Sequence, residues 1–266
     1  MRNRRLAIAI VAMGVALGLT ACGPEDTAKT STGAAGSSAS AAKAPAIADP
    51  TADLAAAAAK LGDQTMKFDL DMSGQMTMNG LADPKAKLTQ ATMSMPALGA
   101  DKIEMRVIGN DMYMKMGALG KALGGGKAGN KEWMHIAVDK LGEGSGFNLD
   151  QNGPAGAAEM LSTVTGVERV GNDGFKGTLD LTKSPRFADN KALGAMGDKL
   201  KKIPFTAKKD SEGRLVELTV DMNSLGAGVG SMKTTYHDFG TPVSVEAPPA
   251  AQVQEMPSQF SGILNA

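Results

Sequence analysis

The chain is poor in the side chains from which catalytic and metal sites are usually built. Its 266 residues include one Cys, two His and few aromatics: one Trp, two Tyr and seven Phe. The two His have no Cys at a spacing that suits a metal, and no Gly-rich phosphate loop precedes a helix. Basic and acidic residues number 28 each, which argues against a nucleic-acid partner. We therefore expect a protein that is not an enzyme and has no cofactor, no metal and no nucleic-acid ligand.

The single cysteine, Cys22, closes the segment Leu19-Thr20-Ala21-Cys22. Three arginines among the first five residues and an apolar run over 6–19 precede it. The run is too short for a spanning helix, which needs about 20 apolar residues. This order resembles a bacterial lipoprotein signal; the alternative is an ordinary secreted protein with a stray cysteine. The resemblance implies a signal peptide over 1–21, a diacylglycerol on Cys22 and attachment to the extracytoplasmic face of the cell membrane.

Composition separates a tether from a folded domain. Residues 23–48 are rich in Ala, Ser, Gly, Thr and Pro, which cannot bury enough apolar surface to fold. We expect a flexible tether over 22–48, with an r.m.s. reach of about 28 Å, one domain over 49–248 and a partly ordered tail over 249–266. Removal of 1–21 leaves 25 basic and 28 acidic residues. Acyl chains rather than positive charge would therefore hold the mature chain on the membrane.

Apolar and polar residues alternate with period two through the domain, which predicts half-buried strands. Phe68 and Leu70, for example, alternate with Lys67 and Asp69. Strands are expected over 67–78, 87–95, 102–107, 112–116, 133–137, 175–181, 203–207, 216–222 and 232–239, and helices over 52–61, 154–164 and 188–202. Turn residues between successive strands, such as Gly109-Asn110, indicate hairpins. The predicted class is α+β with an antiparallel sheet.

Methionine dominates the apolar face of these strands. The chain has 18 Met, of which Met1 and Met13 fall in the signal segment. Met is unbranched and suits surfaces that accept variable apolar partners, although a Met stripe is more often plain core. Three short helices over a long one-sided sheet would leave a cleft of the kind that binds small ligands. The expected cavity-lining residues are Phe68, Leu70, Met72, Met76, Met78, Met93, Met95, Met105, Val107, Met112, Met114, Met116, Leu179, Val220 and Met222.

The two histidines do not indicate a catalytic site. His135 should share the outward face of its strand with Trp133, as a surface residue. His237 and Asp238 are adjacent, and adjacent strand residues point to opposite faces, so they should not form a dyad. Neither position favours an enzyme.

Four further motifs resemble a known family: Lys67-Phe68-Asp69-Leu70, Ile108-Gly109-Asn110-Asp111-Met112-Tyr113-Met114-Lys115, Lys131-Glu132-Trp133-Met134 and Tyr236-His237-Asp238-Phe239-Gly240-Thr241-Pro242-Val243. With the signal and the tether, they resemble the LppX/LprG/LprF lipoproteins of high-GC Gram-positive bacteria, from about Ala52 to Pro248. The resemblance implies a LolA/LolB-like fold, in which helices close a strongly curved antiparallel half-barrel around a hydrophobic cavity. It implies binding and transport of acylated lipid or glycolipid, with no catalytic residues. The high Met content and few aromatics depart from the family.

Two hypotheses follow from the sequence. In the first, a monomeric lipoprotein carries an acyl-chain lipid or glycolipid in a Met-lined cavity, with a possible membrane transporter as partner. In the second, the domain is an interaction module that docks on a membrane transporter or sensor, and the Met face is a filled core. Periodicity does not distinguish them, because it does not reveal volume.

Overall fold

The structure is a computed structural model in which the chain falls into two compact units, 1–46 and 47–266. It describes residues 49–98, 100–117, 131–141, 156–184, 197–226, 228 and 230–256, all in the second unit. The predicted signal peptide, Cys22 and nearly all of the tether therefore lie outside the described residues. Within those ranges, no helix has the length and apolar character needed to cross a membrane.

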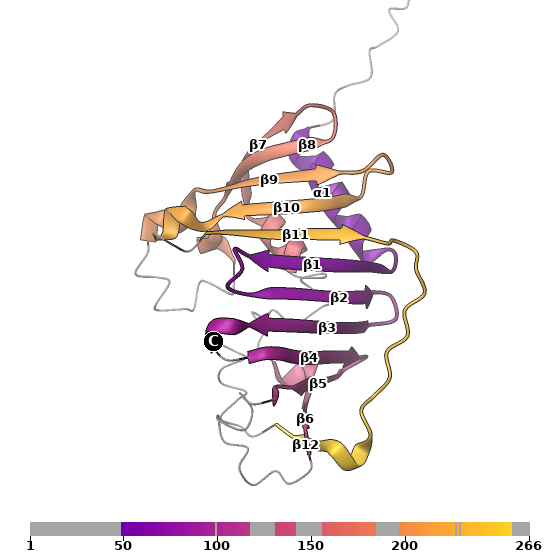
Figure 1. Cartoon of the computed structure of the whole chain (residues 1–266). Coiled ribbons are helices and arrows are strands. Elements are labelled where there is room, and N and C mark those ends of the chain that lie inside the picture. The colour runs from indigo at the N-terminus through magenta and orange to yellow at the C-terminus, as the bar shows by residue number, and fades with distance from the viewer. Residues whose placement is uncertain are drawn as a thin grey trace, which may run out of the picture. The chain divides into compact units, whose positions relative to one another are not determined.

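Twelve strands form a single sheet in the second unit (Figure 1). Their bounds are β1 Met66–Met72, β2 Thr77–Asp83, β3 Leu88–Met95, β4 Ala100–Ile108, β5 Asp111–Lys115, β6 Trp133–Ala137, β7 Val164–Val170, β8 Gly174–Leu179, β9 Ile203–Lys209, β10 Leu215–Asp221, β11 Ser231–His237 and β12 Val253–Glu255. Their order is β12-β6-β5-β4-β3-β2-β1-β11-β10-β9-β8-β7. Each neighbouring pair is antiparallel except β12 with β6. The sheet-dominated α+β class is confirmed, whereas a strong curvature and closure around a cavity stay predictions.

Two α-helices accompany the sheet in the described ranges, α1 Pro50–Ala59 and α4 Ala157–Ser162. The 3-10 segments are η1 Lys60–Gly62, η2 Pro96–Leu98, η3 Val138–Lys140, η5 Leu181–Lys183, η6 Gly197–Lys201, η7 Met222–Leu225 and η8 Ala250–Gln252. Helix α1 begins where Asp49 Oδ1 accepts a hydrogen bond from Thr51 N at 3.0 Å, and Pro50 suits its first turn. The helix predicted over 52–61 is thus confirmed as α1 followed by η1.

Helix α1 contacts α4, β7 and β10 and buries Leu54. An ion cluster fixes its first turn, because Asp53 Oδ2 lies 2.7 Å from Arg169 Nη1 and 2.6 Å from Lys209 Nζ. The hydrogen bond from Lys209 is the main cause that lowers the pKa of Asp53, against an opposing effect of burial. Both cations also lie over the ring of Phe175, at 5.6 and 5.7 Å from its centroid. The cluster therefore ties α1 to strands β7, β8 and β9.

The strand register assigns alternating residues to two faces, since residues paired across strands point to the same side. Phe68 pairs with Gly80, Gly80 with Ala91, Ala91 with Met105 and Met105 with Met114. We call the face that carries these residues the inner face. The outer face carries the intervening residues, such as the exposed side chains of β1. The period-two alternation in the sequence is thus a property of one continuous sheet.

Two phenylalanines on the inner face each cover a cross-strand glycine. A Cβ added to Gly80 would lie 2.6 Å from Phe68 Cζ and 2.7 Å from the Gln90 carbonyl oxygen. A Cβ on Gly177 would lie 2.9 Å from Phe205 Cε1. In both pairs the ring occupies the space that a side chain on the neighbouring strand would need.

The prediction of one strand over 67–78 is wrong, because a turn divides this segment into β1 and β2. Ser73 and Gly74 adopt left-handed φ angles of 49° and 74°, and Met72 N donates to Met76 O at 2.8 Å. The turn contains four residues. Because four is an even number, the inward-pointing residues carry even numbers both in β1 and in β2. The alternation therefore continues across the turn although the chain reverses.

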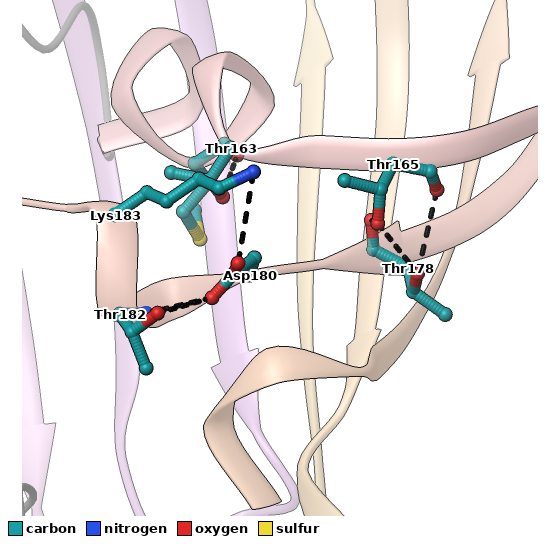
Figure 2. Close-up of polar contacts among 7 residues, drawn as sticks. Thr163, Thr165, Thr178, Asp180, Thr182 and Lys183 are labelled. Carbon is teal, nitrogen blue, oxygen red and sulfur yellow. Dashed lines mark hydrogen bonds and ion pairs between the residues drawn. The ribbon is translucent and has the colours of Figure 1, made fainter. Parts of the chain in front are cut away.

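The helix predicted over 154–164 is shorter, because Val164 begins β7, a strand that the sequence analysis did not predict. Figure 2 shows the side chains at this boundary. Thr163 Oγ1 donates to Met160 O at 2.8 Å, at the end of α4. Along β7, the hydroxyls of Thr165 and Thr178 are 2.9 Å apart, across the pairing with β8. Pairing of β-branched residues with β8 thus overrides the helical expectation.

Other observed boundaries of helices and strands also differ from the predicted ones. Of the helix predicted over 188–202, residues 197–201 form the 3-10 segment η6, and 185–196 lie outside the described residues. Leu181 belongs to η5, which starts where Asp180 Oδ1 accepts a hydrogen bond from Thr182 N (Figure 2). Met116 follows β5, and Met222 begins η7, so neither lies in a strand. Strand β12, in the segment expected to be a tail, is a further element that the sequence analysis did not predict.

Candidate functional site

The predicted lining residues divide into two groups by exposure. Those that are buried are Phe68, Leu70, Met105, Val107, Met112, Met114, Leu179 and Val220. Those that are half-buried are Met72, Met76, Met78, Met93, Met95, Met116 and Met222. The half-buried group consists entirely of methionines, and Met232 on β11 shares this degree of exposure.

These eight methionines lie along one end of the sheet; the other half-buried methionines of the described residues, Met160 and Met256, lie in α4 and after β12. Strands β1, β3, β5 and β10 run toward this end, and β2, β4 and β11 start from it (left in Figure 1). Register pairs Met72 with Met232 and Met78 with Met93 on the inner face. We call this set, Met72, Met76, Met78, Met93, Met95, Met116, Met222 and Met232, the methionine rim. Toward the other end of the same strands, Met66 and Met112 are fully buried.

The methionine rim borders a packed apolar surface. Six of its members, Met78, Met93, Met95, Met116, Met222 and Met232, pack against the buried core. Thioether side chains with three rotatable bonds can rearrange around an apolar partner of variable shape. The rim therefore combines partial exposure, adaptable side chains and continuity with the apolar inner face.

Two hydroxyls on the inner face lack hydrogen-bond partners within the described part of the chain. Thr234 Oγ1 and Thr89 Oγ1 are buried, and no described group accepts or donates a hydrogen bond to either. Thr234 pairs with Leu70 on one side and with Leu218 on the other. A buried, unpaired hydroxyl is costly and uncommon in folded proteins. Thr234 is thus a buried polar group on the inner face whose hydroxyl has no partner among the described residues.

The outer face carries a hollow of about 200 Å³ with a different character. It is lined by Lys67, Phe68, Asp69, Asn79, Gly80, Leu81, Gln90, Ala91, Thr92 and His237. Charged groups such as Lys67 and Asp69 in the lining do not suit an acyl chain, and the volume is below that of most ligand pockets. This hollow is therefore not the apolar cavity that the sequence predicts.

The expectation that His237 and Asp238 would not meet is wrong. Asp238 leaves the strand with a left-handed φ of 51°, which turns its carboxylate back to the outer face. Its Oδ2 lies 3.5 Å from His237 Nδ1 and 2.8 Å from Lys67 Nζ. His237 Nε2 lies 2.8 Å from Asp69 Oδ2. These exposed groups form a surface ion network.

Sequence reasoning left several inner-face residues out of the predicted lining. Met134 pairs with Met114 and is buried, and Tyr236 pairs with Phe68 and is also buried. Met134 follows Trp133, which was expected to face outward. Because adjacent strand residues point to opposite faces, the sequence could have indicated that Met134 points inward. No sequence signal indicates that the half-buried methionines share one end of the sheet.

No family model matches the chain, and no curated protein matches it. The resemblance to the LppX/LprG/LprF lipoproteins therefore rests on the sequence motifs alone.

Proposed function

We propose that the protein is a membrane-anchored lipoprotein of the cell envelope that binds and carries an acylated lipid or glycolipid. The observation that carries the proposal is the methionine rim, which lies at one end of an otherwise buried apolar face. In this proposal the acyl chain enters at the rim and lies against the inner face. Cys22 carries the lipid anchor on the extracytoplasmic side, and a membrane transporter is a possible partner.

The driving force would be transfer of the acyl chain out of water. Each buried methylene contributes about 0.8 kcal/mol, so most of the affinity would come from the chain and little from the head group. Thr234 supports the proposal because its unpaired hydroxyl can donate to an ester carbonyl oxygen. Such a bond would remove the cost of leaving this hydroxyl unpaired in the empty protein.

The first test uses the mature chain with Cys22→Ser, which removes the anchor and leaves the domain unchanged. Solvent extraction and mass spectrometry should identify a bound acyl lipid, and the emptied protein should take up a fluorescent fatty-acyl probe. Absence of both would refute the carrier function.

The second test locates the site. Met72→Gln combined with Met232→Gln places two amides at a cross-strand pair of the rim. Because burial of each thioether against the chain contributes on the order of 1 kcal/mol, we expect probe affinity to fall at least about tenfold. Leu81→Gln, on the outer face, is the matched control and should leave uptake unchanged. Equal loss in both variants would contradict a site at the rim.

The same rim could instead receive an apolar segment of a membrane protein. The observation that favours this alternative is the dense burial of the core, where Leu54, Ile203 and Leu218 are fully inaccessible. A folded protein that takes up no lipid, and yet loses binding to a transporter when Met72 and Met232 are changed, would support the interaction module.

A further inference from the structure

The C-terminal strand β12 adds to the edge of the sheet by a short parallel pairing. Its three residues pair with β6, in the register Val253 with Trp133 and Glu255 with His135. Met256 N then donates to His135 O at 2.7 Å. So short a strand makes few backbone hydrogen bonds, and side-chain contacts, among them Met256 against the buried core, add to its attachment.

His135 of β6 contacts β12 through one ring nitrogen and β5 through the other. Nδ1 lies 2.8 Å from Glu255 Oε1 on β12, and Nε2 lies 2.7 Å from Asp111 Oδ1 on β5. A neutral imidazole has a single N–H, so it can donate to only one of these carboxylates and turns a lone pair toward the other. The imidazolium donates to both. The geometry therefore fits the protonated ring and does not fit the neutral one.

The surroundings of His135 favour its positive charge. Burial lowers the pKa of His135, but hydrogen bonds and charges from Asp111 and Glu255 outweigh this effect and leave the pKa above its ordinary 6.5. The ring of Tyr113 lies beside it, at 5.2 Å between centroids. Burial, together with Asp111 and Glu255, raises the pKa of Tyr113 above 10.0, so this phenol stays neutral through the range in which His135 titrates.

Two cations lie over the ring of the neighbouring Trp133. Arg106 lies 4.6 Å and Lys115 6.0 Å from the centroid of its ring. Lys115 is paired with Glu132 at 2.5 Å, and Arg106 Nη1 donates to Glu246 O at 2.9 Å, in the segment that leads to β12. The hydrogen bond to Glu132 raises the pKa of Lys115 above its ordinary 10.5, so Lys115 keeps its charge while His135 loses its proton.

We propose that protonated His135 is a pH-operated latch that holds the C-terminal strand β12 on the edge of the sheet and releases it when the imidazole loses its proton. Because the pKa of His135 is raised in the docked state, docking of β12 is favoured at low pH and release at high pH. The latch is at full strength below the pKa of the undocked state, in which Asp111 still contacts the ring, and it weakens as the pH rises through the docked pKa, which the additional contact with Glu255 makes higher. Between the two values, the docking constant should fall about tenfold for each pH unit. Release would uncover the edge of β6 and the indole of Trp133.

The chain contains its own reporter of this step. Trp133 is the single Trp, it is 4% exposed, and it pairs with Val253 of β12. As the pH rises from about 5 to about 9, we expect its emission to shift to the red and acrylamide quenching to increase, with a midpoint above 6.5. Hydrogen exchange of the Met256 amide, corrected for its intrinsic pH dependence, should lose protection with the same midpoint.

Variants distinguish the latch from a general effect of pH. His135→Gln removes the titrating group, so both signals should become independent of pH. Glu255→Gln removes one of the two carboxylates and should move the midpoint to lower pH. His237→Gln is the matched control, because His237 is the other His of the chain and also contacts a carboxylate, that of Asp69.

The latch would be overturned if His135→Gln retained the transition. It would equally be overturned if the unaltered protein kept Trp133 and the Met256 amide protected throughout the titration, or if His237→Gln abolished the change. None of these readouts uses lipid, so the result is separate from that of the carrier tests.

Discussion

Removal of the Thr234 hydroxyl should stabilise the empty protein. The side chain is 0% exposed, lies between Leu70 and Leu218, and has no hydrogen-bond partner among the described residues. An unpaired buried hydroxyl costs about 1–3 kcal/mol. Thr234→Val keeps the shape of the side chain and removes this cost, so we expect a gain of about 1 kcal/mol. In a domain of this size, that gain raises Tm by about 2–4 °C.

The assay is thermal and urea unfolding of the delipidated mature chain carrying Cys22→Ser. Thr235→Val is the matched control, because Thr235 is the neighbouring residue on the same strand, lies on the outer face and pairs with Asp69 and Glu217. Thr235→Val should change the free energy of unfolding by no more than about 0.5 kcal/mol. A loss of 1 kcal/mol or more in Thr234→Val would show that the hydroxyl is paired, and would refute the reasoning. With bound lipid, the gain should shrink or reverse if Thr234 donates to the ligand.

Three further predictions test the packing, the inner face and the anchor. Gly80→Ala should lower stability by about 1–3 kcal/mol in urea unfolding, because the new Cβ meets Phe68 and a backbone carbonyl; Gly62→Ala, with open space around it, should have little effect. Met114→Trp should fold and abolish uptake of the acyl probe if the inner face borders a cavity, whereas unfolding in thermal melts would indicate a filled core. Cys22→Ser should leave Tm unchanged and move the protein out of the membrane fraction; retention after a carbonate wash would exclude Cys22 as the anchor.

Local sequence was sufficient for most strands and their faces. Phe68 and Leu70 point inward because the side-chain period of a strand is two, and that period needs no knowledge of neighbouring strands. The hairpin between β4 and β5 follows in the same way from Gly109-Asn110, where Gly109 takes a left-handed φ of 62°. The turn after Met72 was missed because its even length left the alternation intact.

Contacts between distant segments decided the rest. Val164 belongs to a strand because it pairs with Leu179, and that pairing is not visible in the helical composition of 154–164. The order of the strands, with β1 beside β11, is likewise a long-range property.

The two sites that support the proposals also depend on long-range pairing. The sequence identified the methionines of the rim as apolar-face residues, but their gathering at one end depends on the direction in which each strand crosses the sheet. His135 and Glu255 are 120 positions apart and meet only because β12 returns to the edge of β6. Periodicity reports which face a side chain takes, since that is set by the backbone of its own strand. Which strands are neighbours is set by the total burial and pairing of the whole chain, and only the tertiary structure reveals it.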